Sequence, residues 1–144
     1  MNWIISIFFL FVTISDSQIF IKEFHQLKSE EEEVFFVEKY SKDKAPSVQA
    51  YVCAVEMKQA EYTFNPITKL KIFKRNRKKL DSLLSKHPQN IDLHYIRLLL
   101  QERTPSILGY NDSIKEDKLF LLTKIETQEV SKELQVYIYN NTSL

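Results

Sequence analysis

The chain of 144 residues contains a single glycine, Gly109. Loops that cradle phosphates and the turns of dinucleotide-binding folds need several glycines, because the backbone must approach the ligand closely there. The strained turn that presents a nucleophilic serine needs a glycine on each side of that serine. Sheet proteins also use glycine freely in hairpin turns and bulges. The near-absence of glycine therefore excludes these nucleotide and hydrolase motifs and favours an all-α fold.

Helix start signals divide the chain into six or seven short segments. Ser29 with Glu32, and Ser113 with Glu116, have the spacing of capping boxes. The apolar residues 34–37 after the first box also fit a short strand. Further helix starts are marked at Pro46, Asn65-Pro66, Asn90 and Thr104-Pro105. Because short connections favour antiparallel neighbours, we expect a compact antiparallel array of six or seven short helices.

The segment that follows Pro46 carries apolar residues on two sides of a helix. One stripe contains Val48, Val52 and Val55, and a second contains Ala50 and Cys53. A helix that is apolar on two sides is packed on both, so we expect this helix at the centre of the fold. Cys53 is the one cysteine of the chain, which excludes an internal disulfide and a multi-cysteine metal site. It is predicted to be a small buried hydrophobic residue.

The N-terminus begins with a nearly unbroken apolar run over residues 3–14. The run is too short to cross a bilayer core, which needs about 20 residues. Ser15 and Ser17 have the spacing of a signal-peptidase site, and we predict cleavage between Ser17 and Gln18. Because the run has no preceding lysine or arginine, a packed N-terminal helix or an uncleaved anchor is the alternative. The prediction is a signal peptide over residues 1–17 and an exported, periplasmic or secreted, single helical domain over residues 18–144, with no transmembrane span.

Two local resemblances agree with an all-helical chain. The stretch "LSKHPQNIDLHYIRLLLQ", residues 84–101, resembles the junction between tetratricopeptide-type repeats, with Pro88 and Asn90 at the matching positions. The small residues that let such repeat helices pack closely are replaced by bulky ones, Leu80, Leu83 and Leu84. This resemblance implies a degenerate, repeat-like stack of helical hairpins.

The second resemblance covers more of the chain. The stretches "YVCAVEMKQAEYTFNPITKLKIF" and "HPQNIDLHYIRLLLQERTPSILGY", residues 51–73 and 87–110, resemble a group of uncharacterised small exported helical proteins of flavobacteria and their relatives. The resemblance implies export and an all-α fold, and it implies no functional residues.

The most basic stretch, residues 65–88, has seven basic residues between Lys69 and Lys79 and no acid among them. If the chain turns at Asn76, which tolerates a left-handed conformation, a helix begins with three cations and free backbone N–H groups. That arrangement would form a candidate anion site. We favour the turn over one continuous helix, although charge runs are usually solvated. The candidate anion or partner surface consists of Lys71, Lys74, Arg75, Arg77, Lys78 and Lys79. The alternative is a solvated face, paired with the acidic run at residues 30–33.

The remaining polar residues predict no catalytic, cofactor or metal site. His25, His87 and His94 do not share a helical face at metal-ligand spacing. The run Glu30–Glu33 is interpreted as a solvated helix start favoured by the helix dipole. Balanced charge, with 20 basic and 19 acidic residues, gives no global field that would attract nucleic acid, and we expect no nucleic-acid partner.

These observations predict a non-catalytic, exported helical interaction protein that needs no cofactor and binds a protein or an anionic envelope component. The alternative is a hydrolase or metal-dependent enzyme whose residues converge only in three dimensions. Two carboxylates and a histidine that converge in a cleft would favour the enzyme. A helical face with clustered lysine and arginine would favour the binding protein.

Overall fold

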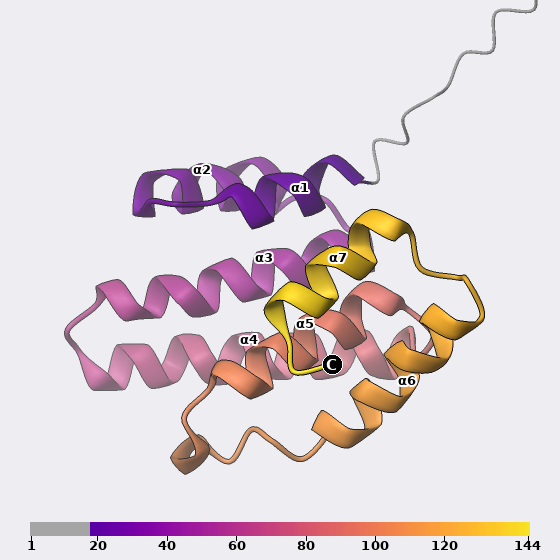
Figure 1. The fold of residues 1–144 in the computed structure, drawn as a ribbon. Coiled ribbons are helices and arrows are strands. Elements are labelled where there is room, and N and C mark those ends of the chain that lie inside the picture. Colours follow the sequence, from indigo (N-terminus) through magenta and orange to yellow (C-terminus); the bar gives the residue numbers. More distant parts are fainter. Residues whose placement is uncertain (1–17) are drawn as a thin grey trace, which may run out of the picture.

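The structure, a computed structural model, describes residues 18–144. The predicted signal peptide, with Ser17 at its end, lies outside the described residues, and Gln18 is the first residue described. Residues 18–144 form helices without any strand (Figure 1). The helices in chain order are α1 (Ile19–Gln26), α2 (Glu30–Tyr40), α3 (Pro46–Gln59), the 3-10 turn η2 (Ala60–Tyr62), α4 (Pro66–Lys86), α5 (Ile91–Arg103), the 3-10 turn η3 (Ser106–Leu108), α6 (Ile114–Glu126) and α7 (Lys132–Asn141).

The prediction of an all-α array with six or seven helices is confirmed, since residues 18–144 form seven α-helices. The helices are not all short, because α4 runs for 21 residues. Within residues 18–144, none of the helices combines the length and the apolar character needed to cross a bilayer.

The start of α2 follows from its capping box. The Ser29 hydroxyl oxygen accepts a hydrogen bond from the Glu32 backbone N–H at 3.2 Å. The Glu32 side chain accepts from the Lys28 backbone N–H at 2.6 Å, one residue before the usual partner. These two bonds satisfy amides that a helix start leaves without partners, and residues 34–37 are therefore helical rather than a strand.

The second predicted capping box, at Ser113, is wrong. The Ser113 side chain makes no cap hydrogen bond at the start of α6. Its backbone N–H instead donates to Gln101 Oε1 at 3.2 Å, and Glu116 turns to Arg97 Nη2 at 3.1 Å. Partners on α5 therefore override the local capping preference at this helix start.

Helix α3 lies at the centre of the described structure and contacts α1, α2, α4 and α5. In Figure 1, α1 and α2 lie on one side of α3, and α4 pairs with it as a hairpin. Val52, Val55, Ala50 and Cys53 are all buried, which confirms the prediction of a helix packed on two sides. Burial raises the pKa of the Cys53 thiol to about 11, so Cys53 is a buried apolar group and not a nucleophile.

The predicted turn at Asn76 is wrong, because α4 continues through this residue. The Asn76 side chain is fully buried, and its Nδ2 donates a hydrogen bond to the Ile72 carbonyl oxygen at 3.1 Å. Leu80 and Leu84, four and eight residues further on, are buried on the same helical face. Packing of this face against α3 and α5 spans both halves of α4 and keeps the helix continuous.

Candidate functional site

The anion site predicted at a helix start after Asn76 is not formed. Helix α4 instead begins after Asn65, whose Oδ1 accepts hydrogen bonds from the Ile67 and Thr68 backbone N–H groups at 2.9 Å and 3.2 Å. Residues 77–79 lie in the middle of α4, where backbone N–H groups bond to the carbonyls of the preceding turn. A ligand at these residues would meet side chains and not free amides.

Three lysines of the predicted surface form one exposed face of α4, which we call the cationic face: Lys71, Lys74 and Lys78. They are spaced three, four and seven residues apart, which places them on one side of a helix. All three are exposed. None of the ion pairs among residues 18–144 involves any of them.

The other three residues of the predicted surface lie beside the cationic face: Arg75, Arg77 and Lys79. Arg75 Nη2 lies 3.4 Å from Glu56 Oε2 on α3. Arg77 is half-buried, lies over the Tyr110 ring at 4.6 Å, and donates from Nη1 to the Gly109 carbonyl oxygen at 3.3 Å. The arginines therefore also link α4 to its neighbours, and three lysines remain turned to solvent.

The acidic run does not pair with the basic stretch in the described structure. Glu33 is fully buried, and its Oε1 lies 2.5 Å from Lys58 Nζ and accepts from the Tyr62 hydroxyl at 3.3 Å. Its Oε2 has no hydrogen-bond partner among the described residues. The interpretation of Glu30–Glu33 as a solvated run is therefore wrong for Glu33, because this residue faces the end of α3.

A histidine and carboxylates converge in a cleft of about 390 Å³ between α4, α5 and the start of α6. His94, Asp81 and Glu116 line the cleft. His94 Nδ1 lies 2.7 Å from Oδ1 of Asp117, and both side chains are buried. The possible ligand atoms of His94, Glu116 and Asp117 lie within 4.8 Å of one another. Two carboxylates and a histidine that converge in a cleft are the combination that would favour a hydrolase or metal-dependent enzyme.

Contacts inside this cluster already use the groups that a metal ion or a general base would need. Arg97 donates to both Asp117 oxygens, at 2.8 Å and 2.7 Å, and although burial lowers the pKa of Arg97, Asp117 raises it above its usual range. His94 Nε2 lies 2.8 Å from the Pro88 carbonyl oxygen, and Phe120 stacks on the ring at 3.7 Å. A metal ion would have to displace the guanidinium, and both ring nitrogens of His94 already have hydrogen-bond partners in the protein. We interpret the cluster as a structural link between α5 and α6.

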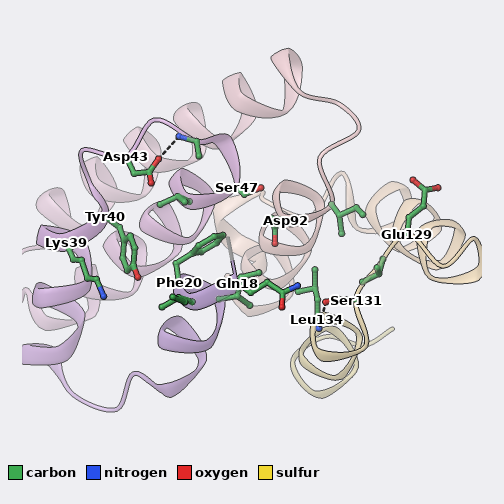
Figure 2. Close-up of a pocket in the computed structure, with 16 residues that line it drawn as sticks. Gln18, Phe20, Lys39, Tyr40, Asp43, Ser47, Asp92, Glu129, Ser131 and Leu134 are labelled. Atoms are coloured by element: carbon green, nitrogen blue, oxygen red, sulfur yellow. Dashed lines mark hydrogen bonds between the residues drawn. The ribbon is translucent and has the colours of Figure 1, made fainter. Parts of the chain in front are cut away.

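A second pocket, of about 760 Å³, lies where the starts of α1, α3, α5 and α7 meet (Figure 2). Asp92 lies at its wall and accepts a hydrogen bond from the Tyr51 hydroxyl at 2.9 Å. Burial raises the pKa of Asp92, against the opposing hydrogen bonds of Ser47 and Tyr51. Lys39 and Glu129 lie at opposite ends of the pocket in Figure 2. Asp92 is thus a partly buried carboxyl group of this pocket whose hydrogen-bond partner is already in place.

A third hollow, of about 700 Å³, is a mainly apolar groove between α3, α4 and α5. Met57, Leu70, Phe73 and Leu100 line it. Residues of the first turns of α4 and of the segment around η3 both line this groove, so these two parts of the chain lie near each other.

Comparison with known proteins found no matching family model, no matching curated protein and no matching solved structure. The geometry of the described residues therefore carries the functional interpretation. The resemblances to flavobacterial exported proteins and to tetratricopeptide-type repeats remain predictions.

Two features of the structure were missed from the sequence. The link between His94, Arg97 and Asp117 joins residues that are 20 or more positions apart in the sequence, and no local spacing indicates it. The exposure of Phe64 and Ile67 at the start of α4 could have been suspected, because Ile67 lies four residues before Lys71 on the polar face of the helix.

Proposed function

We propose that the mature protein is exported to the periplasm or secreted, and that it is a non-catalytic helical protein that binds an anionic component of the cell envelope. The observation that supports the proposal is the cationic face of α4. Lys71, Lys74 and Lys78 project from one side of a continuous helix, without an acidic partner among residues 18–144. The rigid backbone of α4 holds these three charges at a fixed spacing. Phosphate or carboxylate groups on an extended surface are the complementary chemistry.

The expected strength follows from the number of lysines. A lysine near an anionic surface contributes about 1 kcal/mol. Three lysines then contribute about 3 kcal/mol to binding at physiological ionic strength. Because the Debye length falls from about 10 Å at 0.1 M salt to about 3 Å at 1 M, the attraction should be lost at high salt.

Reversal of charge on the cationic face tests the proposal. The variant Lys74→Glu/Lys78→Glu should bind a soluble polyanion such as alginate at least about thirtyfold more weakly, from two contributions of about 1 kcal/mol each. Its matched control is Lys42→Glu/Lys44→Glu, which changes the net charge equally at two exposed residues between α2 and α3. The control should bind as the wild type does. Equal loss in both variants would mean that net charge alone acts, and no loss in either would refute the proposed binding face.

Export is tested separately by the intact mass of the protein from its native source. The apolar run at residues 3–14 and the Ser15-x-Ser17 spacing predict a mature N-terminus at Gln18. The mass should therefore match residues 18–144, with or without cyclisation of the terminal glutamine. A soluble cytosolic protein that retains residues 1–17 would contradict export.

A further inference from the structure

Large apolar side chains are exposed at the end of the molecule where α4 begins. Phe64 is fully exposed, and Ile67 and Ile107 are 65% and 91% exposed. Leu70 and Leu108 are partly exposed, and both line the same apolar groove. We call these five residues the apolar tip: Phe64, Ile67, Leu70, Ile107 and Leu108. Exposed apolar side chains gathered in one place mark a protein or membrane contact.

Contacts from α4 hold the two segments of the apolar tip in place. Arg77 donates to the Gly109 carbonyl oxygen at 3.3 Å and lies over the Tyr110 ring at 4.6 Å. Phe73 meets the same ring edge to face at 5.7 Å. The segment of η3 is therefore fixed beside α4 immediately before Gly109. In Figure 1 the α3–α4 connection lies at the left edge of the view, and the η3 segment, which follows α5, lies below it and nearer the centre.

The apolar tip continues the cationic face. Ile67 and Leu70 precede Lys71, Lys74 and Lys78 at intervals that keep all five on one side of α4. This side of the helix thus begins with apolar side chains and continues with lysines. The combination of projecting apolar groups and lysines is the chemistry of proteins that lie on an anionic lipid surface.

We propose that the apolar tip inserts into the interfacial region of an anionic lipid bilayer while the cationic face contacts the lipid headgroups. The inference rests on the proposed function and names its partner as a membrane surface. Phe64 and Ile107 lie in two separate segments, the connection before α4 and the turn η3, and both side chains are almost fully exposed. A lipid surface deforms around such projections, whereas a protein partner needs matching pockets. The lysines supply the attraction that selects anionic headgroups.

Vesicle binding tests the insertion. The variant Phe64→Ser/Ile67→Ser/Ile107→Ser should bind mixed phosphatidylglycerol and phosphatidylcholine vesicles at least about tenfold more weakly than the wild type. The matched control is Phe35→Ser/Leu119→Ser/Val136→Ser, which removes apolar side chains that are 64%, 69% and 55% exposed elsewhere. It should bind these vesicles as the wild type does. All proteins carry the N-terminus that mass spectrometry finds, so a contribution of that segment cancels in the comparison.

The alginate assay separates this inference from the proposed function. The apolar-tip variant should keep its affinity for alginate, because its lysines are intact, and neutral phosphatidylcholine vesicles should bind the wild type weakly. In a second measurement, the indole introduced by Phe64→Trp should be quenched by brominated lipids. Wild-type binding of vesicles by the apolar-tip variant, or an unquenched indole on anionic vesicles, would overturn the insertion and leave the cationic face untouched. Loss of alginate binding only in Lys74→Glu/Lys78→Glu, with no vesicle binding by any protein, would indicate a soluble polymer or an acidic protein as the partner.

Discussion

Substitution of His25 should reduce the loss of stability of this protein between pH 7.5 and pH 4. His25 lies near the end of α1 and faces α7, where its ring stacks on Tyr137 at 3.9 Å, and its Nε2 lies 3.2 Å from the Tyr95 hydroxyl oxygen of α5. Burial, with a smaller effect of the Arg103 charge, lowers the pKa of His25 from 6.5 to about 4. The folded protein therefore keeps this ring neutral over a pH range in which the unfolded chain protonates it.

The sign and size of the effect follow from proton linkage. Between pH 6.5 and pH 4 the unfolded state binds the additional proton, so the free energy of unfolding falls as the pH falls through this window. One pKa unit corresponds to about 1.4 kcal/mol. The loss should be about 2 kcal/mol, less than the whole change in pKa would give, because the ring is half-buried and solvent screens its charge. For a chain of this size, about 2 kcal/mol lowers the melting temperature by roughly 8 °C.

The assay compares the melting temperatures of the wild type and of His25→Phe between pH 7.5 and pH 4. Phenylalanine keeps the aromatic stack on Tyr137 and cannot be protonated, so the variant should lose roughly 8 °C less than the wild type over this range. Carboxylates that titrate in both proteins cancel in the difference. His25→Gln, which also cannot be protonated, should show the same smaller loss from a lower starting temperature. Parallel pH profiles for the wild type and both variants would refute the assignment to His25.

Three further predictions concern buried or partly buried groups. Asp117→Asn should lower the free energy of unfolding by about 3–5 kcal/mol in denaturant titrations, because it removes the buried partner of the Arg97 charge. Glu116→Gln, which changes the exposed partner, should cost less than about 1 kcal/mol. Equal effects of the two substitutions would contradict the buried link. Cys53 should resist thiol reagents at pH 8 until denaturant is added, because it is buried and its pKa is raised to about 11; rapid labelling of the native protein would contradict this burial. The raised pKa of Asp92 means that the folded state binds its proton more tightly. The free energy of unfolding of Asp92→Asn relative to the wild type should therefore increase as the pH rises above 3.8, the ordinary value for this carboxyl group, and a constant difference would refute it.

The sequence locates the basic residues of the candidate surface but does not show how they are arranged on the molecule. The sequence correctly marks residues 69–79 as the most basic stretch, and helical spacing places Lys71, Lys74 and Lys78 together. It does not reveal whether Asn76 ends a helix, because asparagine is compatible with both a left-handed turn and a buried helical position. Packing against α3 and α5 selects the second possibility, and it thereby separates the half-buried Arg77 from the exposed lysines.

The amino-acid sequence by itself determined the helical class of this protein and the starts of several helices. The scarcity of glycine favours helices along the whole chain. The Ser29 box and the asparagines at 65 and 90 set helix starts because a capping side chain bonds to backbone N–H groups within one helical turn. Tertiary structure alone decided which polar residues became buried and which apolar residues stayed exposed. Glu33 and Asp117 are buried because Lys58 and Arg97 reach them from other helices, and these partners lie too far along the chain for any local pattern to connect them.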